Sequence, residues 1–423
     1  MIGRSARIVL ATIGSLGDLH PCLALALALR ERGHIPVVAS TEVYRVKVGG
    51  LGLEFRAIRP DFDSEDPDLI RKVMDMRRGP EFLLRGLILP ALRDTFEDLA
   101  AICEGADLLI AGEIVFAAPL VAEKLRMPWV SAILSPFSFL SAHDPVVSPL
   151  APSLGFLTSA GWLVNRAILQ SARIGTLPWW APVRRLRREL GLGAGRNPLF
   201  HDKFSDDLTL AMFSPELARP QPDWPAKTVQ TGFVYYDSGE AQAGLAPEIV
   251  AFLEAGEAPI VFTLGSTAVH DPRGFFEASA EAAGILGRRA VLLTGDNAPR
   301  MRLSPDVIAA PYAPFSEIFP RAAAIVHQGG VGTTAQALRS GRPSLIMPCG
   351  FDQPDNGARV RRLGAGSTIS RKRYGAKTAA RALDRLLTLP GYTSNAERIA
   401  NRLRSEDGAG AACEAIERLL VFG

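Results

Sequence analysis

Apolar and polar positions follow two different periods along the first 130 residues. Short apolar runs ("ARIVLATI", "IPVVAS", "ADLLIAG" and "MPWVSAIL") have the length and composition of buried strands. Longer segments between them, such as "HPCLALALALRERG" and "APLVAEKLR", are typical of helices. Strands that alternate with helices predict a parallel sheet with helices on both faces.

The alternation stops between residues 135 and 200, where Pro, Gly and large apolar residues are frequent. The segment "ARPQPDWPAKTVQTGF" then has three prolines and predicts a linker. Beyond it, "APIVFTLGST", "RRAVLLTG", "DVIAAP", "AAAIVHQGG", "PSLIMPCG" and "AGSTIS" restart the strand pattern. We therefore expect an α/β protein of two doubly wound, Rossmann-like domains that face a central cleft, where the ligand binds.

The expected boundaries follow from these changes of pattern. An N-terminal domain would take residues 1–215, a proline-rich linker 216–240, and a C-terminal domain 241–395. The last segment, 396–423, is expected to form helices that pack back on the N-terminal domain. The apolar region 145–165 is uncharged, but its prolines argue against a membrane-spanning helix.

Composition and charge narrow the class of protein. A chain of 423 residues exceeds one ordinary core, and a formal net charge of +3 is nearly neutral for that length. Such a charge gives no support for nucleic-acid binding. The four cysteines form no CxxC pair, which argues against a zinc site or a disulfide framework and fits a reducing cytoplasm. We also expect no signal peptide, because Gly14 to Asp18 interrupt the first apolar run.

The segment "HQGGVGTTAQAL", residues 327–338, predicts an anion site, because a strand meets glycines and then a helix. It is no P-loop, since no Lys-Ser/Thr pair follows the glycines. It matches a dinucleotide fingerprint in part, as Gly330-x-Gly332-x-x-Ala335 with Asp352 about 20 residues further on. The third interpretation is a nucleotide-sugar site, and a plain strand-to-helix turn is the structural alternative.

Chemistry favours the nucleotide-sugar site. A nucleoside diphosphate gains negative charge as it leaves the sugar, and a helix N-terminus with the His327 imidazole would stabilise that charge without a metal. Thr333 and Thr334 add hydroxyl donors. One strand later, Asp352 and Gln353 could each make paired hydrogen bonds to sugar hydroxyls, although Asp352 also suits a helix N-cap.

Two further strand ends carry candidate chemistry. "TLGST", residues 263–267, offers Ser266 and Thr267 as phosphate contacts or forms an ordinary turn. "IGSLGDLHP" places Asp18 as a candidate general base, with His20 to orient or replace it, unless Asp18 only caps the next helix. Asp61-Phe62-Asp63 resembles a metal-binding pair, but its acidic, polar surroundings favour a solvated loop, and we expect no metal.

The stretch from His327 to Asn356 resembles the C-terminal signature of the family 1 glycosyltransferases, which have the GT-B fold. The start, "GSLGD…P", resembles the N-terminal signature of their bacterial members. The pieces "LSPFSFLSAH", "DWP…TGF", "VFTLGST", "PYAP" and "MPCGFDQPDN" are similar to rhamnosyltransferases of mono-rhamnolipid synthesis. The resemblance implies an inverting transfer of a hexose, L-rhamnose or glucose, from a dTDP- or UDP-sugar to a hydroxyl of a hydrophobic small molecule or lipid, with no further cofactor.

The resemblance also assigns roles by position. Asp18 matches the catalytic base, with His20 beside it, and Glu113 is the nearest candidate for the carboxylate that assists the base. Ala335 stands where plant members have a ribose-binding glutamate, which favours a deoxyribose donor. The donor-binding residues it implies are Gly17, Ser266, Thr267, Tyr312, Ala313, His327, Gly329, Gly330, Gly332, Thr333, Thr334, Asp352 and Gln353.

The acceptor is expected in the apolar region of the first domain, which suits a lipid or an aromatic compound, although part of that region is ordinary core. The candidate acceptor-binding residues are Phe137, Phe139, His143, Trp162 and Trp179. The basic run "RRLRRE", residues 184–189, would let a cytoplasmic protein contact the inner membrane face, or is a solvated helix face.

Two functions of other classes remain open. An NAD- or flavin-dependent oxidoreductase would use the Gly330 loop but leaves His327 and Gln353 without roles. A catalytically inactive relative that serves a partner enzyme would be expected to lose Asp18 or the Asp352–Gln353 pair, and this chain has both.

Overall fold

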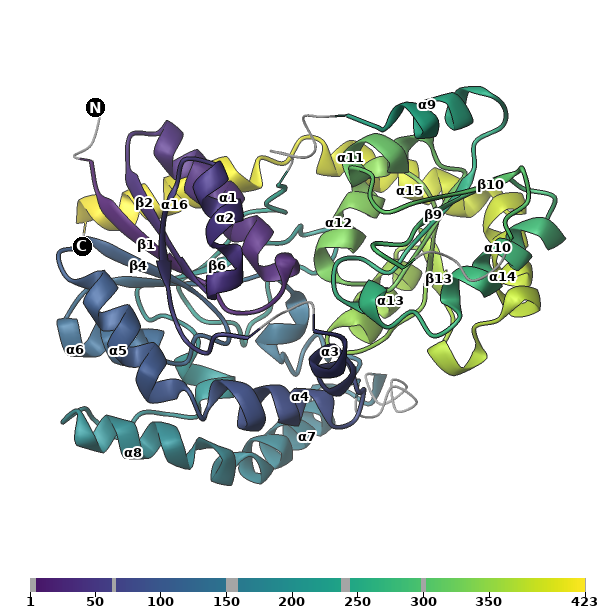
Figure 1. Ribbon diagram of the computed structural model, residues 1–423. Coiled ribbons are helices and arrows are strands. Elements are labelled where there is room, and N and C mark those ends of the chain that lie inside the picture. Colours follow the sequence, from purple (N-terminus) through teal and green to yellow (C-terminus); the bar gives the residue numbers. More distant parts are fainter. Residues whose placement is uncertain (1–4, 63–65, 150–158, 237–243, 298–301, 423) are drawn as a thin grey trace.

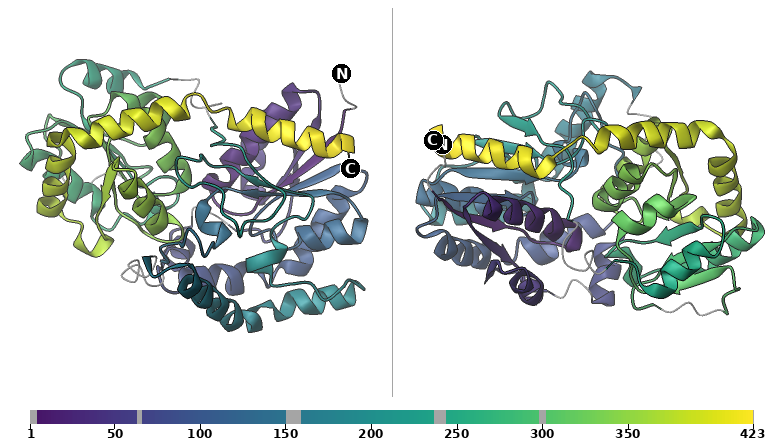
Figure 2. Two further views of the ribbon diagram at one scale, coloured as in Figure 1. Left: turned by 180° about the vertical axis from the view of Figure 1, so that it is seen from behind. Right: turned by 90° about the horizontal axis from the view of Figure 1, so that it is seen from above.

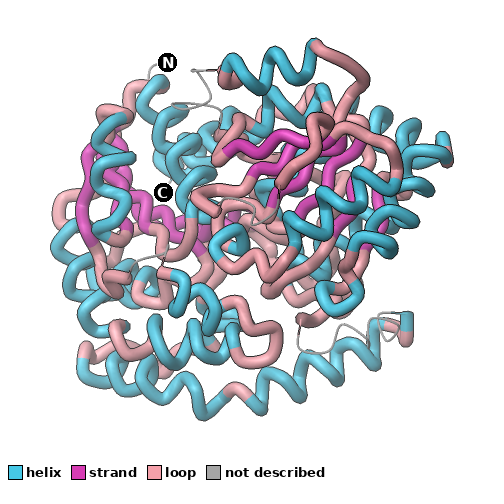
Figure 3. Tube along the Cα trace, turned by 45° about the vertical axis from the view of Figure 1, so that its right-hand side comes forward, coloured by secondary structure: helices cyan, strands magenta, loops and turns pink. Residues whose placement is uncertain are grey.

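The computed structural model describes residues 5–62, 66–149, 159–236, 244–297 and 302–422, and it has two lobes, each built on a parallel sheet (Figures 1 and 3). The N-terminal sheet has the strand order β3-β2-β1-β4-β5-β6-β7, and every neighbouring pair is parallel. Its strands are β1 (Arg7–Ala11), β2 (Ile35–Ser40), β3 (Glu54–Ala57), β4 (Leu108–Gly112), β5 (Trp129–Ile133), β6 (Leu208–Ala211) and β7 (Thr228–Gln230).

Helices cover both faces of this sheet and enclose two apolar clusters. Leu19, Leu23 and Leu29 of the first helix fill one cluster, and Leu99 and Leu120 belong to the other. The helices of the lobe are α1 (Leu16–Glu31), α2 (Arg45–Gly50), α3 (Pro67–Val73), α4 (Gly79–Glu81), α5 (Leu92–Cys103), α6 (Ala118–Leu125), α7 (Trp162–Gly175) and α8 (Ala181–Glu189).

The C-terminal sheet has the order β10-β9-β8-β11-β12-β13 and is also parallel throughout. Its strands are β8 (Ile260–Thr263), β9 (Ala290–Leu293), β10 (Val307–Ala310), β11 (Ala324–His327), β12 (Ser344–Ile346) and β13 (Gly366–Thr368). Its helices are α9 (Pro247–Glu254), α10 (Phe275–Ile285), α11 (Phe315–Ile318), α12 (Val331–Ser340), α13 (Gln353–Arg362), α14 (Ala376–Thr388) and α15 (Pro390–Leu403). Two doubly wound domains were predicted from the alternation, and this prediction is confirmed.

The last helix, α16 (Gly408–Phe422), returns to the N-terminal lobe. It packs on α1, its Cys413 and Ile416 lie in the N-terminal core, and Glu417 forms an ion pair with Arg32 at 2.9 Å. Figure 2 shows α15 and α16, in yellow, running from one lobe to the other. The preceding helix α15 packs on α12 of the C-terminal lobe, so the return begins at Gly408 rather than at 396.

The expected linker also differs from the structure. Thr228–Gln230 forms the edge strand β7, paired with β6, so this part of 216–240 belongs to the N-terminal sheet. Its prolines lie before the strand, where they remove no ladder hydrogen bond. Residues 237–240 lie outside the described part of the chain.

Each sheet reverses its strand order at one point, between β1 and β4 in the first and between β8 and β11 in the second. Ligands of open parallel sheets bind at such points, beyond the carboxyl ends of the strands. Three of the predicted residues, Asp18, Glu113 and Ser266, lie after the carboxyl ends of β1, β4 and β8. His327 is the last residue of β11.

Candidate active site

Asp18 lies in the first turn of α1, where the chain turns tightly after β1. Its Oδ2 accepts hydrogen bonds from the Ser15 backbone N–H at 2.9 Å and from the Ser15 hydroxyl at 3.3 Å. Gly14 makes this possible, because it has φ +138° and a Cβ there would lie 2.3 Å from the Asp18 carboxylate oxygen. Asp18 therefore caps the helix and at the same time keeps one oxygen for other partners.

The Asp18 carboxyl has Glu113 as an acidic neighbour. Burial raises the pKa of Asp18 to about 6, the hydrogen bonds from Ser15 oppose that rise, and the negative charge of Glu113 adds to it. Glu113 forms an ion pair with Lys203 at 3.6 Å, and the Lys203 ammonium donates to the Ser138 carbonyl at 2.6 Å. Burial lowers the pKa of Lys203, and the charge of Glu113 opposes this. No local pattern indicates a role for Lys203, which follows a region without strand alternation.

Asp18 and Glu113 both line one cavity. Apart from these two carboxylates its lining is predominantly apolar, so an acceptor alcohol there would place its carbon skeleton against hydrocarbon and its hydroxyl near a base. The other lining residues are Leu10, Ala11, Thr12, Ile13, Cys22, Leu25, Ile110, Gly112, Ile114, Ala132, Leu134 and Met212.

His327 ends β11 and is fully buried. Its Nδ1 accepts a hydrogen bond from the Gly329 backbone N–H at 3.1 Å, so the ring proton must sit on Nε2. Nε2 is buried and has no partner among the described residues. Burial lowers the pKa of His327 to about 3. The imidazole is thus a neutral donor with one unused N–H.

The loop before α12 leaves the helix N-terminus without a side-chain cap. Gln328 packs across it, with Nε2 3.4 Å from the Thr333 hydroxyl, and a Cβ on Gly265 would come within 2.1 Å of that nitrogen. The Thr334 hydroxyl and the Gln328 carbonyl oxygen are buried without a partner among the described residues. The uncapped backbone N–H groups and the Thr334 hydroxyl are donors of the kind that an anion site requires, whereas the Gln328 amide oxygen is an acceptor. Sequence reasoning missed Gln328, which stands between two predicted residues.

Asp352 and Gln353 open α13 beside this loop. Gln353 Oε1 accepts from the backbone N–H groups of Cys349 at 2.7 Å and Gly350 at 3.1 Å, so its role includes shaping the turn. Asn356 donates both to Asp352 at 2.8 Å and to the Gly329 carbonyl at 2.9 Å, which joins α13 to the glycine loop.

Asp352 occupies the N-cap position of α13, but its side chain makes no capping hydrogen bond. Burial raises the pKa of its carboxyl to about 7, and the Asn356 amide and the nearby Ser135 hydroxyl of the other lobe oppose the rise. The preceding Phe351 has φ +51°, an unfavourable conformation for an aromatic residue. A half-buried carboxylate that makes no capping hydrogen bond and is held on a strained turn suits a ligand contact better than a structural cap.

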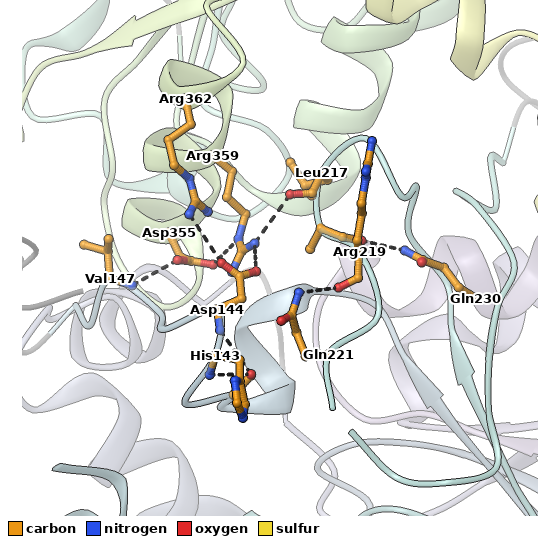
Figure 4. Close-up of polar contacts among 12 residues, drawn as sticks. His143, Asp144, Val147, Leu217, Arg219, Gln221, Gln230, Asp355, Arg359 and Arg362 are labelled. Carbon is orange, nitrogen blue, oxygen red and sulfur yellow. Dashed lines mark hydrogen bonds and ion pairs between the residues drawn. The ribbon is translucent and has the colours of Figure 1, made fainter. Parts of the chain in front are cut away.

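Helix α13 is also tied to the N-terminal lobe (Figure 4). The buried Arg359 guanidinium donates to Asp355 on its own helix at 2.7 Å and to Asp144 of the other lobe. Asp355 in turn accepts from the Val147 backbone N–H at 2.9 Å. The helix that carries Asp352 is therefore fixed relative to the first domain.

Other predicted donor residues have diverse surroundings. Gly17 donates its N–H to the Ser15 hydroxyl at 3.2 Å, so it contributes to the α1 cap. Ser266 and Tyr312 are exposed, at the ends of the loops after β8 and β10, whereas Ala313 is buried. These positions are compatible with contacts along one ligand.

His20 does not line the cavity of Asp18. Its ring stacks on Tyr236 at a centroid distance of 4.6 Å, and burial lowers its pKa to about 4. Because α1 carries Asp18 and His20 on different faces, two positions apart, His20 packs against the chain that leaves the N-terminal lobe.

None of the five predicted acceptor residues lines the Asp18 cavity, although two of them, His143 and Trp162, stack on each other. Phe139 lies in the core and stacks on Trp224 at 4.0 Å. His143 stacks on Trp162, while Trp179 lies under the Arg85 guanidinium. Phe137 is half-buried. The aromatic residues of this irregular segment predict a binding surface, but the ring of Phe139 packs in the core.

The basic and acidic runs also have structural partners. Arg187 is buried against Glu123, and Arg185 pairs with Glu189 at 2.8 Å. Asp61 accepts from the Glu42 backbone N–H at 3.3 Å, while Asp63 lies outside the described residues. Within the described ranges, no group of three or more His, Cys, Asp or Glu side chains could hold a metal ion, and no helix is long and apolar enough to cross a bilayer.

Comparison with known proteins gives a consistent result. Residues 287–418 match the family model described as erythromycin biosynthesis protein CIII-like, C-terminal domain. O-mycaminosyltylonolide 6-deoxyallosyltransferase of Streptomyces fradiae is 31% identical, with 97% of both chains covered. A sterol 3-beta-glucosyltransferase of Cryptococcus neoformans is 28% identical over 98% of this chain, which spans 27% of that longer protein.

The fold of this chain is also similar to that of solved glycosyltransferase structures. Spinosyn rhamnosyltransferase SpnG, complexed with thymidine diphosphate, superposes with a TM-score of 0.66 at 16% identity, covering 97% of this chain and 100% of the other. At that identity the likeness establishes the fold alone. The GT-B architecture expected from the sequence is therefore confirmed.

Proposed function

The chain belongs to the EryCIII-like group of the family 1 glycosyltransferases, and from this premise we propose that it transfers a hexose from a nucleoside-diphosphate sugar to a hydroxyl of a hydrophobic acceptor with inversion. That it is a glycosyltransferase follows from the family and confirms the predicted enzyme class. Membership also removes the reason to invoke an oxidoreductase. The donor, the acceptor and the catalytic residues are the content of the proposal.

Asp18 would act as the general base. The observation that carries this role is a half-buried carboxylate that lines a predominantly apolar cavity, with a pKa of about 6 and one oxygen held by Ser15. Such a carboxylate is ionised at neutral pH and still basic enough to take the proton of an attacking alcohol. Glu113 would keep that basicity high through its charge, and Lys203 would hold Glu113 in place.

The departing diphosphate would be stabilised at the start of α12. The unused Nε2–H of His327, the uncapped backbone N–H groups and the Thr334 hydroxyl offer donors where the negative charge develops. These donors are preorganised, so they need no reorientation during the reaction. The proposal requires no resident metal or other cofactor.

We assign the sugar to Asp352 and Gln353 and propose a dTDP-linked 6-deoxyhexose, with L-rhamnose as the first candidate and UDP-glucose as the competitor. Ala335 supports a deoxyribose donor, since it lacks the carboxylate that would bind a ribose hydroxyl. The related tylosin-type enzyme is named for a 6-deoxyhexose, and SpnG was solved with thymidine diphosphate.

The acceptor would be a lipid alcohol or another hydrophobic alcohol, as in rhamnolipid synthesis, because the cavity beside Asp18 is predominantly apolar. One relative is named for a sterol substrate and another for a macrolide. A cytoplasmic enzyme with peripheral contact to the inner membrane face would meet such an acceptor.

The test combines binding with turnover. The purified protein is titrated with dTDP, UDP and NAD in a thermal-shift assay, where a ligand at about 100 times its Kd adds ~2.7 kcal/mol of stability. We expect stabilisation by dTDP, weaker by UDP, and its loss in His327→Ala. Mass spectrometry then follows dTDP-rhamnose and UDP-glucose with 3-hydroxy fatty acids, sterols and macrolide aglycones. Stabilisation by NAD alone would refute the donor site, and tight dTDP binding without any transfer would favour an inactive partner protein.

A further inference from the structure

Helix α7 has the reverse of the usual polarity of a surface helix. Its polar Asn165 is buried, while most of its large apolar side chains are exposed. An amphipathic helix of a globular domain normally buries its apolar stripe and exposes its polar face. The exposed apolar residues of α7 are Trp162, Leu163, Val164, Ile168 and Ile174.

The outermost of these side chains share one face. Leu163 and Ile174 are 64% and 58% exposed, and eleven positions, about three turns, separate them on the same side of the helix. The opposite side is anchored, because Asn165 donates to the Ala142 carbonyl at 3.4 Å and Trp162 stacks on His143. The apolar stripe is therefore held outward by the fold.

The charge around this stripe has one sign. Residues 145–188 contain no Asp or Glu, although acidic residues flank the segment as Asp144 and Glu189. The segment has six arginines, of which Arg185 pairs with Glu189 and Arg187 is buried against Glu123. The other four are Arg166, Arg173, Arg184 and Arg188. Helices α7 and α8 lie along the same edge of the N-terminal lobe (Figure 1).

We propose that the outward face of α7, together with the arginines of α7 and α8, docks on an anionic lipid bilayer. The aliphatic side chains of the outward face enter the boundary between headgroups and acyl chains, and arginines contact the lipid phosphates. The absence of Asp and Glu from residues 145–188 favours this partner over a protein surface, which would itself carry mixed charge. For the acceptor, the inference rests on the proposed function, because a docked enzyme would take a membrane-held alcohol.

Vesicle flotation tests the docking without reference to catalysis. Vesicles of phosphatidylcholine with about one quarter phosphatidylglycerol should bind the protein, and pure phosphatidylcholine vesicles should bind it much less. The double variant Leu163→Ser/Ile174→Ser should lose at least about tenfold in binding. Arg166→Gln/Arg188→Gln should lose about 25-fold, at about fivefold for each arginine, and salt should weaken the remainder.

The matched control is Val46→Ser/Ile285→Ser, which removes two exposed apolar side chains far from α7 and should leave vesicle binding unchanged. The inference fails if the wild type ignores anionic vesicles, if the control pair loses as much binding, or if the α7 variant changes only the oligomeric state. Transfer to a detergent-solubilised acceptor is measured in parallel. Vesicle binding without transfer would overturn the proposed function and leave the docking surface intact.

Discussion

Asp144 of the N-terminal lobe forms an ion pair with Arg359 of helix α13, a residue 215 positions later in the chain. Arg359 is buried, and its second carboxylate partner is Asp355. Asp144 also meets the exposed Arg362 at 3.3 Å, as Figure 4 shows. Helix α13 begins at the predicted sugar pair, so this ion pair relates the donor side of the site to the acceptor side.

Replacing Asp144 by Ala should destabilise the protein by about 3 kcal/mol, because it leaves a buried guanidinium with one carboxylate in place of two. Arg362→Ala removes the exposed partner of the same aspartate and should cost less than about 1 kcal/mol. Urea denaturation measures both values. Equal losses in the two variants would show that the buried pair adds nothing to the attachment of α13.

Asp18→Asn should lower kcat by about 100- to 10,000-fold, the usual contribution of a general base. For the wild type, kcat/KM should fall as the pH drops through about 6, where the Asp18 carboxyl takes up its proton. Glu113→Gln should move this limb to lower pH, because it removes a neighbouring negative charge. A pH profile of initial rates checks both predictions. An unshifted acidic limb in Glu113→Gln would show that the charge of Glu113 does not raise the pKa of Asp18.

The same pKa predicts an effect on stability. Because burial raises the pKa of Asp18 from 3.8 to about 6, the folded protein binds this proton more tightly than the unfolded chain. The associated stability is present at low pH and is lost as the pH rises from about 4 through 6. Asp18→Asn, which never ionises, should therefore have a higher free energy of unfolding than the wild type at pH 8, by up to about 3 kcal/mol, and should gain little at pH 4. Calorimetry at the two pH values decides.

His327 should remain neutral, with its proton on Nε2, at all pH values from 5 to 9, because its pKa is about 3 and Nδ1 is occupied by the Gly329 N–H. Nitrogen NMR of the imidazole distinguishes this tautomer from the alternative and from the cation. On addition of dTDP, the Nε2 proton should move to the shift of a strong hydrogen bond. If the His327 imidazole titrates near pH 6, the burial of its ring is contradicted. If the chemical shift of the Nε2 proton does not change with dTDP, His327 does not contact the diphosphate.

The strands and the glycine loop were predictable because both have local causes. Apolar runs of strand length are a property of the chain itself, and Gly329, Gly330 and Gly332 after such a run indicate an anion site. Lys203 and Gln328 were not predictable in the same way. Lys203 reaches Glu113 only because a segment distant in sequence packs there. The Gln328 side chain can lie across the loop only because Gly265 has no Cβ, which would come within 2.1 Å of its Nε2.

The candidate acceptor residues lie outside the Asp18 cavity for a related reason. Phe139 was assigned to binding because it lies in an irregular, apolar segment, but Trp224, far along the chain, covers its ring. Conversely, Leu25 and Met212 line the cavity beside Asp18, although nothing in the sequence around them distinguishes them from core residues. Burial by distant parts of the chain decides which apolar residues are free to bind, and no local pattern records it.

Two glycines of one loop should respond differently to the same substitution. Gly329 has φ +93°, and a Cβ there would lie 2.8 Å from the Ile346 side chain, so Gly329→Ala should destabilise the fold by about 1–3 kcal/mol. At Gly332, in the first turn of α12, a Cβ meets no protein atom within 4 Å. Gly332→Ala should keep or raise the melting temperature of the free protein, since alanine favours helix.

The ligand then separates the two explanations of this loop. If the diphosphate rests on the start of α12, the extra methyl group at position 332 approaches it, and dTDP affinity should fall by at least tenfold in Gly332→Ala although the free protein is no less stable. Isothermal titration of the variant with dTDP measures this. Undiminished affinity would mean that the glycines serve only the turn from β11 into the helix, and the diphosphate would have to be placed elsewhere in the cleft.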